Sequence, residues 1–239
     1  MDVINYLLKE KKLKIVQNTQ MFNYSLDSIL LSKFVTINKN IFQILDIGSG
    51  NAPIPLILST RTNAKIVGVE IQKEPFELAQ KSIKINNLEN QITIINQDIN
   101  DYSKKFDREF FDVITCNPPF FKVTENSNLK NEIHKAIARH EIKLNLDDVF
   151  KISRKLLKNN GIVAIVHRPE RLVEILETMR KYNIEPKRLQ FVYPKKNKES
   201  NMMLIEGKKN GNPGLKLLPP LYAHEENGDY TVEINDFFC

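Results

Sequence analysis

Short apolar segments of strand length alternate with amphipathic segments of helix length through most of this chain. Five segments are expected as strands: Ile41 to Ile47, Ala64 to Val69, Gln91 to Asn96, Phe110 to Cys116 and Ile162 to His167. The expected helices are Pro53 to Ser59, Glu74 to Asn86, Leu146 to Asn159, which stops at Gly161, and Pro169 to Tyr182. Two final strands are expected at Leu189 to Tyr193 and Met202 to Glu206. This alternation predicts an α/β fold with a mostly parallel sheet covered by helices on both faces.

The segment before the first of these strands is expected to be a short extension. Its expected elements are a short helix from Asp2 to Leu8, a strand from Leu13 to Val16, and a helix capped by Ser25 or Asp27 that runs to about Val35. We therefore expect residues 1–40 to pack as an N-terminal extension on one larger domain, residues 41–239.

Charge and cysteine content narrow the possible partners. The 239 residues include 35 basic and 29 acidic side chains, a formal net charge of +6, which favours a polyanionic partner such as nucleic acid. The cysteines, Cys116 and Cys239, provide neither a disulfide framework nor a zinc-binding spacing, so we expect no metal. The lysine-rich N-terminus lacks the apolar core of a signal peptide, and no segment approaches the roughly 18 apolar residues of a membrane span. We therefore expect a cytoplasmic protein that does not contact a membrane.

Ligands of parallel sheets bind at the carboxyl ends of the strands, so the residues that follow each strand are the candidates for a site. The stretch Asp46-Ile47-Gly48-Ser49-Gly50 lets the backbone turn tightly and approach a ligand, although a plain strand-to-helix turn uses the same residues. Glu70 follows about twenty residues later, where a carboxylate accepts hydrogen bonds from ribose hydroxyls. The pair predicts a nucleoside ligand without separating NAD from S-adenosylmethionine. Pro53 stands in place of the third glycine of a dinucleotide site, which disfavours a pyrophosphate clamp.

The next two strand ends carry the more specific pattern. Asp98 is placed to accept a hydrogen bond from the exocyclic amine of an adenine, and a helix cap is an equally good interpretation. In Asn117-Pro118-Pro119-Phe120 the two prolines fix the backbone and orient the Pro118 carbonyl, and the Asn117 amide oxygen is a second acceptor. These two acceptors can hold both hydrogens of a planar amino group, while Phe120 offers a face on which a base stacks.

In order and spacing, these residues resemble the class I S-adenosylmethionine-dependent methyltransferases. That resemblance implies a Rossmann-like fold with a seven-stranded, mostly parallel sheet whose last strand is antiparallel, and it makes residues 41–239 the catalytic domain. It implies an S-adenosyl-L-methionine site formed by Asp46, Gly48, Gly50, Glu70, Ile71, Asp98, Ile99 and Asn117. The tetrapeptide resembles the (Asn/Asp/Ser)-Pro-Pro-(Tyr/Phe/Trp) signature of enzymes that methylate amino nitrogens of adenine, guanine or glutamine. The resemblance therefore assigns catalysis to Asn117, Pro118 and Phe120.

A narrower resemblance extends over nearly the whole chain. The Phe-x-Tyr-Ser-x-Asp-x-x-Leu-Leu pattern within Gln17 to Phe34 is similar to the N-terminal segment of the bacterial valine-tRNA (adenine-N6)-methyltransferase family. Ala138 to Glu141, His167 to Leu172 and Tyr193-Pro194 also resemble that family. The resemblance implies that tRNA is the partner and that the adenine immediately 3′ of the anticodon is methylated. Ala52-Pro53 departs from the family, in which a glycine is common, and is expected to tighten the cofactor loop without abolishing it.

The implied reaction depends on orientation and charge. Acceptors at Asn117 and Pro118 would pull the amino group toward tetrahedral geometry and stabilise the positive charge that develops on nitrogen. Because the methyl-sulfonium is already electrophilic, the reaction requires neither a metal nor a covalent enzyme intermediate.

The target base must leave any stack, which costs least in a single-stranded anticodon loop. Phe121 to Glu141 is either a lid ordered by RNA or a surface insertion. The candidate RNA-binding side chains are Lys122, Lys130, Lys135, Arg139, His140, Lys195, Lys196, Lys198, Arg168 and Arg171.

Three other functions remain open at this point. A guanine-N2 methyltransferase acting on ribosomal RNA shares the tetrapeptide, but many such enzymes carry an added RNA-binding domain. A protein-glutamine methyltransferase acting on release factors usually has tyrosine after the prolines and a helical substrate domain in front. A non-catalytic RNA-binding or assembly protein could keep the same fold, although the intact Asn117 and Glu70 argue against it. A monomer is favoured.

Overall fold

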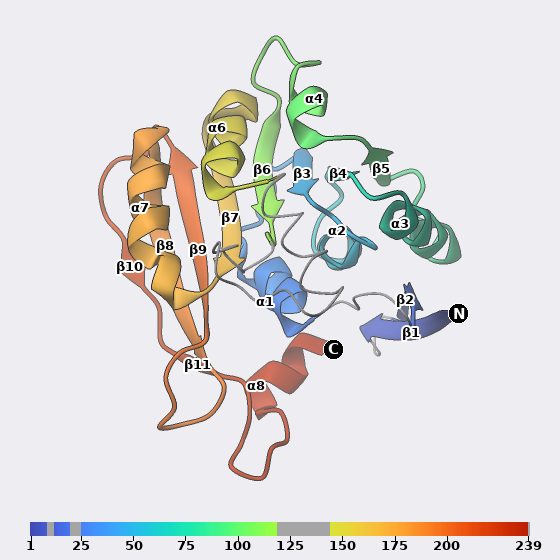
Figure 1. The fold of residues 1–239 in the computed structure, drawn as a ribbon, viewed down its shortest axis with the longest axis vertical. Helices are drawn as coiled ribbons and strands as arrows, with labels where there is room; N and C mark the ends of the chain where they lie inside the picture. The colour runs from blue at the N-terminus through green and yellow to red at the C-terminus, as the bar shows by residue number, and fades with distance from the viewer. Residues whose placement is uncertain (9–11, 20–24, 119–143, 239) are drawn as a thin grey trace, which may run out of the picture.

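The computed structural model describes residues 1–8, 12–19, 25–118 and 144–238, and a central sheet organises this part of the chain (Figure 1). Its main strands are β3 (Gln43–Ile47), β4 (Lys65–Glu70), β5 (Ile92–Asn96), β6 (Phe111–Cys116), β7 (Leu157–His167), β8 (Ile184–Tyr193) and β9 (Met202–Lys209). Their order across the sheet is β5-β4-β3-β6-β7-β9-β8. Two two-residue strands, β10 (Lys216–Leu217) and β11 (Leu221–Tyr222), pair with β8. The predicted seven strands are present, and these two short pairings extend the sheet to nine.

Strand direction confirms the predicted class of sheet. Neighbouring strands from β5 to β7 are parallel, and β9 is antiparallel to both β7 and β8. Helices α1 (Leu26–Phe34), α2 (Pro53–Ser59) and α3 (Lys73–Ile85) contribute to one hydrophobic core, and α4 (Ile99–Ser103), α6 (Leu146–Leu156) and α7 (Leu172–Lys181) contribute to a second. Ile44 belongs to the first core and its neighbour Leu45 to the second. The parallel strands are mostly apolar because both faces of the sheet are buried, and Asp46 and Thr115 are buried polar exceptions.

The N-terminal segment forms a β-hairpin, so the short helix predicted for Asp2 to Leu8 is wrong. Strand β1 (Asp2–Leu8) pairs antiparallel with β2 (Leu13–Asn18), and the predicted strand there is confirmed. A helix of these 7 residues would be marginal in water, whereas pairing with β2 satisfies the backbone along the segment. The hairpin docks on α3, where the Val16 amide donates to Ser82 Oγ at 2.9 Å.

The boundary between α6 and β7 also differs from the prediction. The helix expected from Leu146 to Asn159 ends at Leu156, and Leu157 has extended backbone angles of φ −69° and ψ 136°. Leu157 pairs with Phe111 of β6, so the polar residues that follow it belong to β7. Gly161 therefore lies within a strand and does not end the helix. Only glycine fits at this position, since a Cβ there would lie 2.9 Å from a backbone oxygen.

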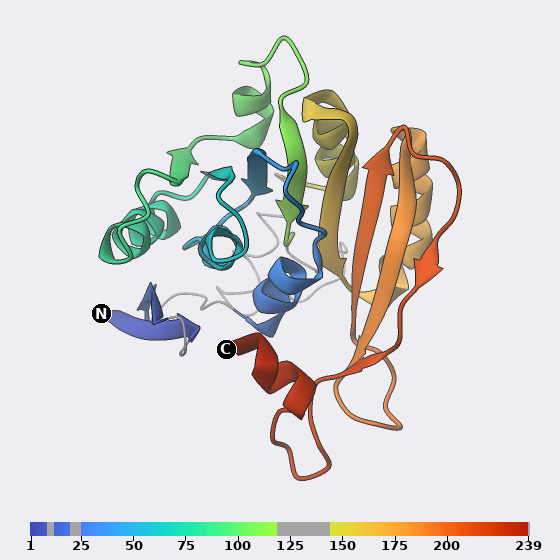
Figure 2. The ribbon, with the colours of Figure 1, turned by 180° about the vertical axis from the view of Figure 1, so that it is seen from behind.

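Helix α1 lies at the edge of the sheet where β6 and β7 end, in both views of the molecule (Figures 1 and 2). It follows the N-terminal hairpin in sequence and packs against α2, β7 and β9. The C-terminal helices α8 (Val232–Asn235) and η2 (Asp236–Phe238) also reach this end of the molecule, and η2 contacts α1. Helices α1, α8 and η2 therefore lie at the end of the sheet where a parallel sheet binds its ligands.

Candidate active site

The predicted site residues that the structure describes lie at one edge of the sheet because the strands that carry them are parallel neighbours. Asp46 lies near the end of β3, beside Thr115 of β6. Glu70 is the last residue of β4, Asp98 follows β5, and Asn117 follows β6. Residues separated by up to about seventy positions in the chain are thus brought to the same edge, as expected for a site at the carboxyl ends of parallel strands.

The glycine loop after β3 presents bare backbone. Gly48 and Gly50 have left-handed backbone angles, with φ of 69° and 55°, and a Cβ built on either would meet no atom within 4 Å. The amides of Gly48 and Ser49 donate to the Val69 carbonyl at 2.9 and 3.2 Å, which fixes the loop to β4. Ala52 completes the turn with φ 70°, a conformation that costs roughly 1–2 kcal/mol for a residue other than glycine. The loop therefore leaves open space directly against the main chain.

Glu70 connects this loop to the end of β4. Its side chain is buried, and its two carboxylate oxygens accept the amide of Gly50 at 2.8 Å and the amide of Gln72 at 2.7 Å. A carboxylate has about four acceptor positions, so two remain for hydroxyl groups of a ligand. Glu70 can therefore shape the loop and bind a ribose at the same time.

Asp46 places an unsatisfied carboxylate oxygen beneath the site. Thr115 Oγ1 donates to Asp46 Oδ1 at 2.6 Å, whereas Oδ2 is buried and has no hydrogen-bond partner within the described residues. Burial raises the pKa of the Asp46 carboxyl to about 8; the hydrogen bond from Thr115 opposes that rise and the negative charge of Glu70 adds to it. A buried acceptor without a partner is a feature of sites that hold a ligand or water.

Asp98 caps a helix, which the sequence left as the alternative to binding the amine of an adenine. It is the N-cap of α4, and its Oδ1 accepts the amide of Asn100 at 2.8 Å. Its second carboxylate oxygen remains a candidate acceptor for an adenine amine. Ile99 is buried at the start of α4, while Ile71 after β4 is 37% exposed. Cofactor contacts of Asp98, Ile71 and Ile99 stay predictions.

Asn117 is half-buried at the end of β6, and its amide group contacts α1. Its Nδ2 donates to Ser28 Oγ at 3.2 Å, which leaves its Oδ1 without a hydrogen-bond donor among the residues that the structure describes. Pro118 is buried beside it. Phe120, the predicted stacking residue, lies outside the described residues, as does the segment from Phe121 to Glu141.

With this geometry in place, comparison with known proteins decides the family. Residues 38–210 match a sequence family described as "Methyltransferase domain". This chain belongs to that methyltransferase family. The match begins just before β3 and ends just after β9, so it contains every predicted site residue.

Two curated relatives and one solved structure support the assignment. A protein of Flavobacterium psychrophilum named tRNA1(Val) (adenine(37)-N6)-methyltransferase is 26% identical over 204 residues, covering 84% of this chain and 86% of its own. A protein of the same name from Parabacteroides distasonis is 27% identical and covers 89% of each chain. A crystal structure from Agrobacterium tumefaciens, described as a predicted O-methyltransferase, superposes with a TM-score of 0.69 at 18% identity over 89% of this chain and 95% of that one. The predicted family resemblance and Rossmann-like fold are confirmed.

Two residues of the methyltransferase site were not predicted from the sequence. Thr115 supports Asp46, and it could have been found as a polar residue inside an otherwise apolar buried strand, where it requires a partner. Ser28 contacts Asn117, but nothing in its local pattern pointed to a residue 89 positions away. The neighbouring Ser25 is the N-cap of α1 as predicted, although its side chain makes no capping hydrogen bond.

Basic side chains of the methyltransferase follow the ends of β7 and β8, at the same edge as Asn117. Arg168 donates to the Asn201 carbonyl at 2.6 Å, and Arg171 forms an ion pair with Glu174 at 2.6 Å. Lys195 donates to the Glu226 carbonyl at 3.0 Å, whereas two further lysines of the β8–β9 connection, Lys196 and Lys198, are exposed. The candidates Lys122, Lys130, Lys135, Arg139 and His140 lie outside the described residues.

Among the described residues, none of the helices combines the length and the apolar character needed to cross a membrane. Within the same ranges, histidine, cysteine, aspartate and glutamate side chains do not form a group of three or more that could hold a metal ion.

The buried Asp46 carboxyl predicts a pH-dependent stability for the ligand-free methyltransferase. Because its folded pKa of about 8 exceeds its ordinary value of 3.8, the folded protein holds this proton more tightly than the unfolded chain does. This contribution to the free energy of unfolding is complete below about pH 4 and is lost as pH rises through about 8. Asp46→Asn keeps the shape and cannot titrate, so its stability should decline less than wild type over this range. Urea unfolding of both proteins between pH 4 and 9 measures the difference, and parallel profiles would contradict the prediction.

Proposed function

We propose that this methyltransferase transfers the methyl group of S-adenosyl-L-methionine to N6 of an adenine in tRNA, immediately 3′ of the anticodon of a valine tRNA. The curated relatives that carry the name tRNA1(Val) (adenine(37)-N6)-methyltransferase match this chain over 84% and 89% of its length, which supports the choice of tRNA. The observation that carries the chemistry is Asn117, whose amide oxygen is available at the same edge of the sheet as the glycine loop and Glu70.

The residues at this edge fit the cofactor. Gly48 and Gly50 provide a cradle that a side chain would fill, Glu70 retains acceptor positions for ribose hydroxyls, and Asp46 Oδ2 is a buried acceptor without a partner within the described part of the chain. Asp98 would accept from the adenine amine, with Ile71 and Ile99 at the base. When bound, the cofactor supplies an electrophilic methyl group on a sulfonium.

The protein's part in the reaction is to orient and polarise the target amino group. The lone pair of N6 is conjugated into the adenine ring and is a poor nucleophile. Acceptors at Asn117 Oδ1 and the Pro118 carbonyl hold the two amino hydrogens and favour tetrahedral nitrogen, which frees the lone pair. They also stabilise the positive charge that develops there. The proton leaves to water after transfer, and Phe120 is assigned to stacking on the base.

We propose a two-part organisation of the chain and a single macromolecular partner. Residues 1–40 form an extension packed on the catalytic domain of residues 41–239, a division supported by the hydrogen bond between Val16 and Ser82. The protein acts as a cytoplasmic monomer with tRNA as its partner, without a metal or a membrane. The target base enters by leaving its stack, at a cost that the single-stranded anticodon loop keeps low.

Binding of tRNA is expected to weaken steeply with salt, because basic side chains that contact phosphates release counterions. Lys196 and Lys198 are exposed on the β8–β9 connection near the site edge, so replacing either by glutamine should reduce the slope of log affinity against log salt by about one. Lys84→Gln, on the exposed side of α3, is the matched control. Filter binding or anisotropy between low and high salt measures these slopes. Affinity that does not change with salt would contradict nucleic-acid binding by these groups.

Nucleoside mass spectrometry tests the function directly. A deletion strain should lack N6-methyladenosine at one tRNA position, and the purified protein with S-adenosylmethionine should restore it. Restoration of N2-methylguanosine in ribosomal RNA would identify a guanine methyltransferase, and methylglutamine in a release factor would identify a protein methyltransferase. Absence of transfer to any RNA or protein would contradict an enzymatic role.

A further inference from the structure

Helix α1 holds the side chain on which the proposed chemistry depends. Ser28 is 5% exposed, and its hydroxyl oxygen accepts a hydrogen bond from Asn117 Nδ2 at 3.2 Å. Within the described residues, this is the single hydrogen bond made by the Asn117 side chain. An amide can present either its oxygen or its nitrogen to a neighbour. Bonding of the nitrogen to Ser28 directs the oxygen away from α1.

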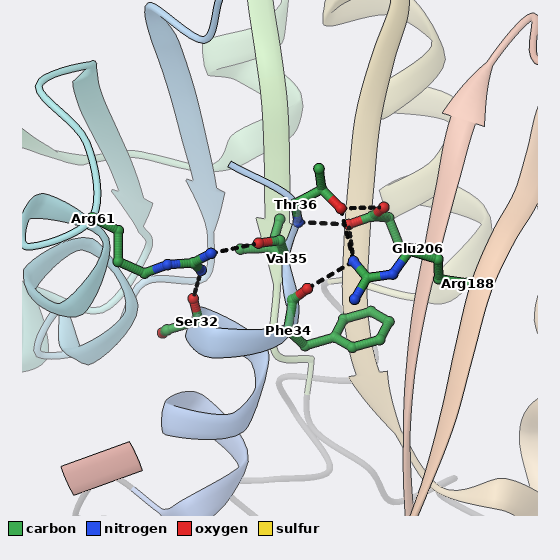
Figure 3. Close-up of polar contacts among 7 residues, drawn as sticks. All are labelled: Ser32, Phe34, Val35, Thr36, Arg61, Arg188 and Glu206. Atoms are coloured by element: carbon green, nitrogen blue, oxygen red, sulfur yellow. Dashed lines mark hydrogen bonds and ion pairs between the residues drawn. The ribbon is translucent and has the colours of Figure 1, made fainter. Parts of the chain in front are cut away.

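The position of Ser28 is fixed because the end of α1 is held by a cluster of charged side chains (Figure 3). The last carbonyls of a helix have no partner within the helix. Here the Arg61 guanidinium donates to the carbonyls of Ser32 and Val35, the latter at 3.0 Å. Arg61 follows α2, so it joins α1 to the helix beside it.

A second arginine binds the same end of α1 from the opposite side (Figure 3). Arg188 of β8 donates to the Phe34 carbonyl at 2.9 Å and lies 4.6 Å from the centre of the Phe34 ring. Glu206 of β9, buried beside Arg188, accepts the amide and hydroxyl of Thr36 at 2.7 and 2.9 Å. We call Arg61, Arg188, Glu206 and Thr36 the α1 clamp. Because three parts of the fold supply it, α1 is held in one place relative to the sheet, and so is Ser28.

We infer that Ser28 is a positioning residue, which fixes the rotamer of the Asn117 side chain so that its amide oxygen lies where the amino group of the target base is held. The expected effect on methyl transfer rests on the proposed function, whereas the hydrogen bond between Ser28 and Asn117 is present in the structure whatever the function is. Without Ser28, the Asn117 amide loses the contact that holds it against α1 and samples other rotamers, in which its oxygen does not meet the substrate amino group. The glycine loop and Glu70 keep their own contacts.

The test compares Ser28→Ala with Ser32→Ala, a second buried serine of the same helix, whose hydroxyl donates to the Ser28 backbone carbonyl as its one hydrogen bond within the described ranges. In single-turnover methylation of tRNA, Ser28→Ala should reduce the rate about tenfold and leave cofactor KM unchanged, while Ser32→Ala stays within about twofold of wild type. In an Asn117→Ala background, Ser28→Ala should have no further effect, because it acts through Asn117. An equal loss in both backgrounds would overturn the inference, since Ser28 would then act elsewhere.

A second measurement does not depend on activity. The side-chain amide signals of Asn117 in ¹⁵N-labelled protein are identified by their absence from Asn117→Asp. Hydrogen exchange at this amide should be about tenfold faster in Ser28→Ala than in Ser32→Ala or wild type. Equal exchange in all three proteins would overturn the inference. Wild-type protein that forms no N6-methyladenosine in tRNA would contradict the proposed function, and the exchange rates would still decide the role of Ser28.

Discussion

Replacing Asn117 by alanine is expected to lower the rate of methyl transfer about 10²–10³-fold, by analogy with single oxyanion-hole groups. The lost acceptor matters most in the transition state, where positive charge develops on the target nitrogen. Cofactor binding should remain nearly intact, because the glycine loop is fixed by Val69 and Glu70 and makes no hydrogen bond to Asn117. Single-turnover methylation with calorimetry of cofactor binding in parallel separates the two effects.

Asn117→Asp is the informative companion, because the carboxylate keeps the acceptor and loses the donor to Ser28. It should retain more activity than Asn117→Ala. Asn63→Ala, an exposed asparagine before β4, should behave as wild type. Thermal unfolding must show that Asn117→Ala is folded. Wild-type rates for a folded Asn117→Ala would mean that the tetrapeptide is a structural turn and that the proposed mechanism is wrong.

Replacing Glu70 by alanine is expected to weaken cofactor binding at least tenfold. Two charge-assisted hydrogen bonds to ribose hydroxyls, each worth about 1.5–3 kcal/mol, would be lost. The structure adds a second cause: the amides of Gly50 and Gln72 lose their acceptor, so the glycine loop should loosen. The affinity for tRNA should hardly change, because Glu70 is buried and the candidate phosphate-binding side chains follow β7 and β8.

The same variant should be less stable, since the amides of Gly50 and Gln72 lose a charged acceptor. Calorimetry is therefore run well below its unfolding temperature. Glu74→Ala, an exposed acid in the first turn of α3, controls for the loss of charge. Wild-type cofactor affinity in Glu70→Ala would remove this residue from the site.

The sequence predicted the strands well where both faces of a strand are buried. Strands β3 to β6 were predicted within two residues of their observed ends because a parallel strand covered on both faces must be apolar throughout. The same reasoning identified Glu70, Asp98 and Asn117 as site candidates, because polar residues directly after such strands are easily recognised. Their meeting at one edge followed from the parallel order.

The failures occur where long-range pairing overrides a local pattern. Asp2 to Leu8 lacks the alternation of apolar and polar residues typical of a half-buried strand, and its pairing with β2 decides the outcome. Leu157 and the residues after it were assigned to a helix, but pairing with Phe111 draws them into β7. Ser28 was beyond prediction for the same reason, because its contact with Asn117 depends on how α1 crosses the sheet edge.

The α1 clamp has a consequence for biosynthesis. Thr36 and Glu206 are 170 residues apart, and the arginine that completes the ion pair, Arg188, is also made late. A nascent chain can pair β3, β4 and β5 and close the glycine loop while Arg188 and Glu206, the late members of the α1 clamp, have not yet been translated. The methyl-donor pocket should therefore form first and the full support for Asn117 last. A polypeptide released before β8 would carry every residue predicted for the site and hold α1 through Arg61 but not through Arg188 and Glu206.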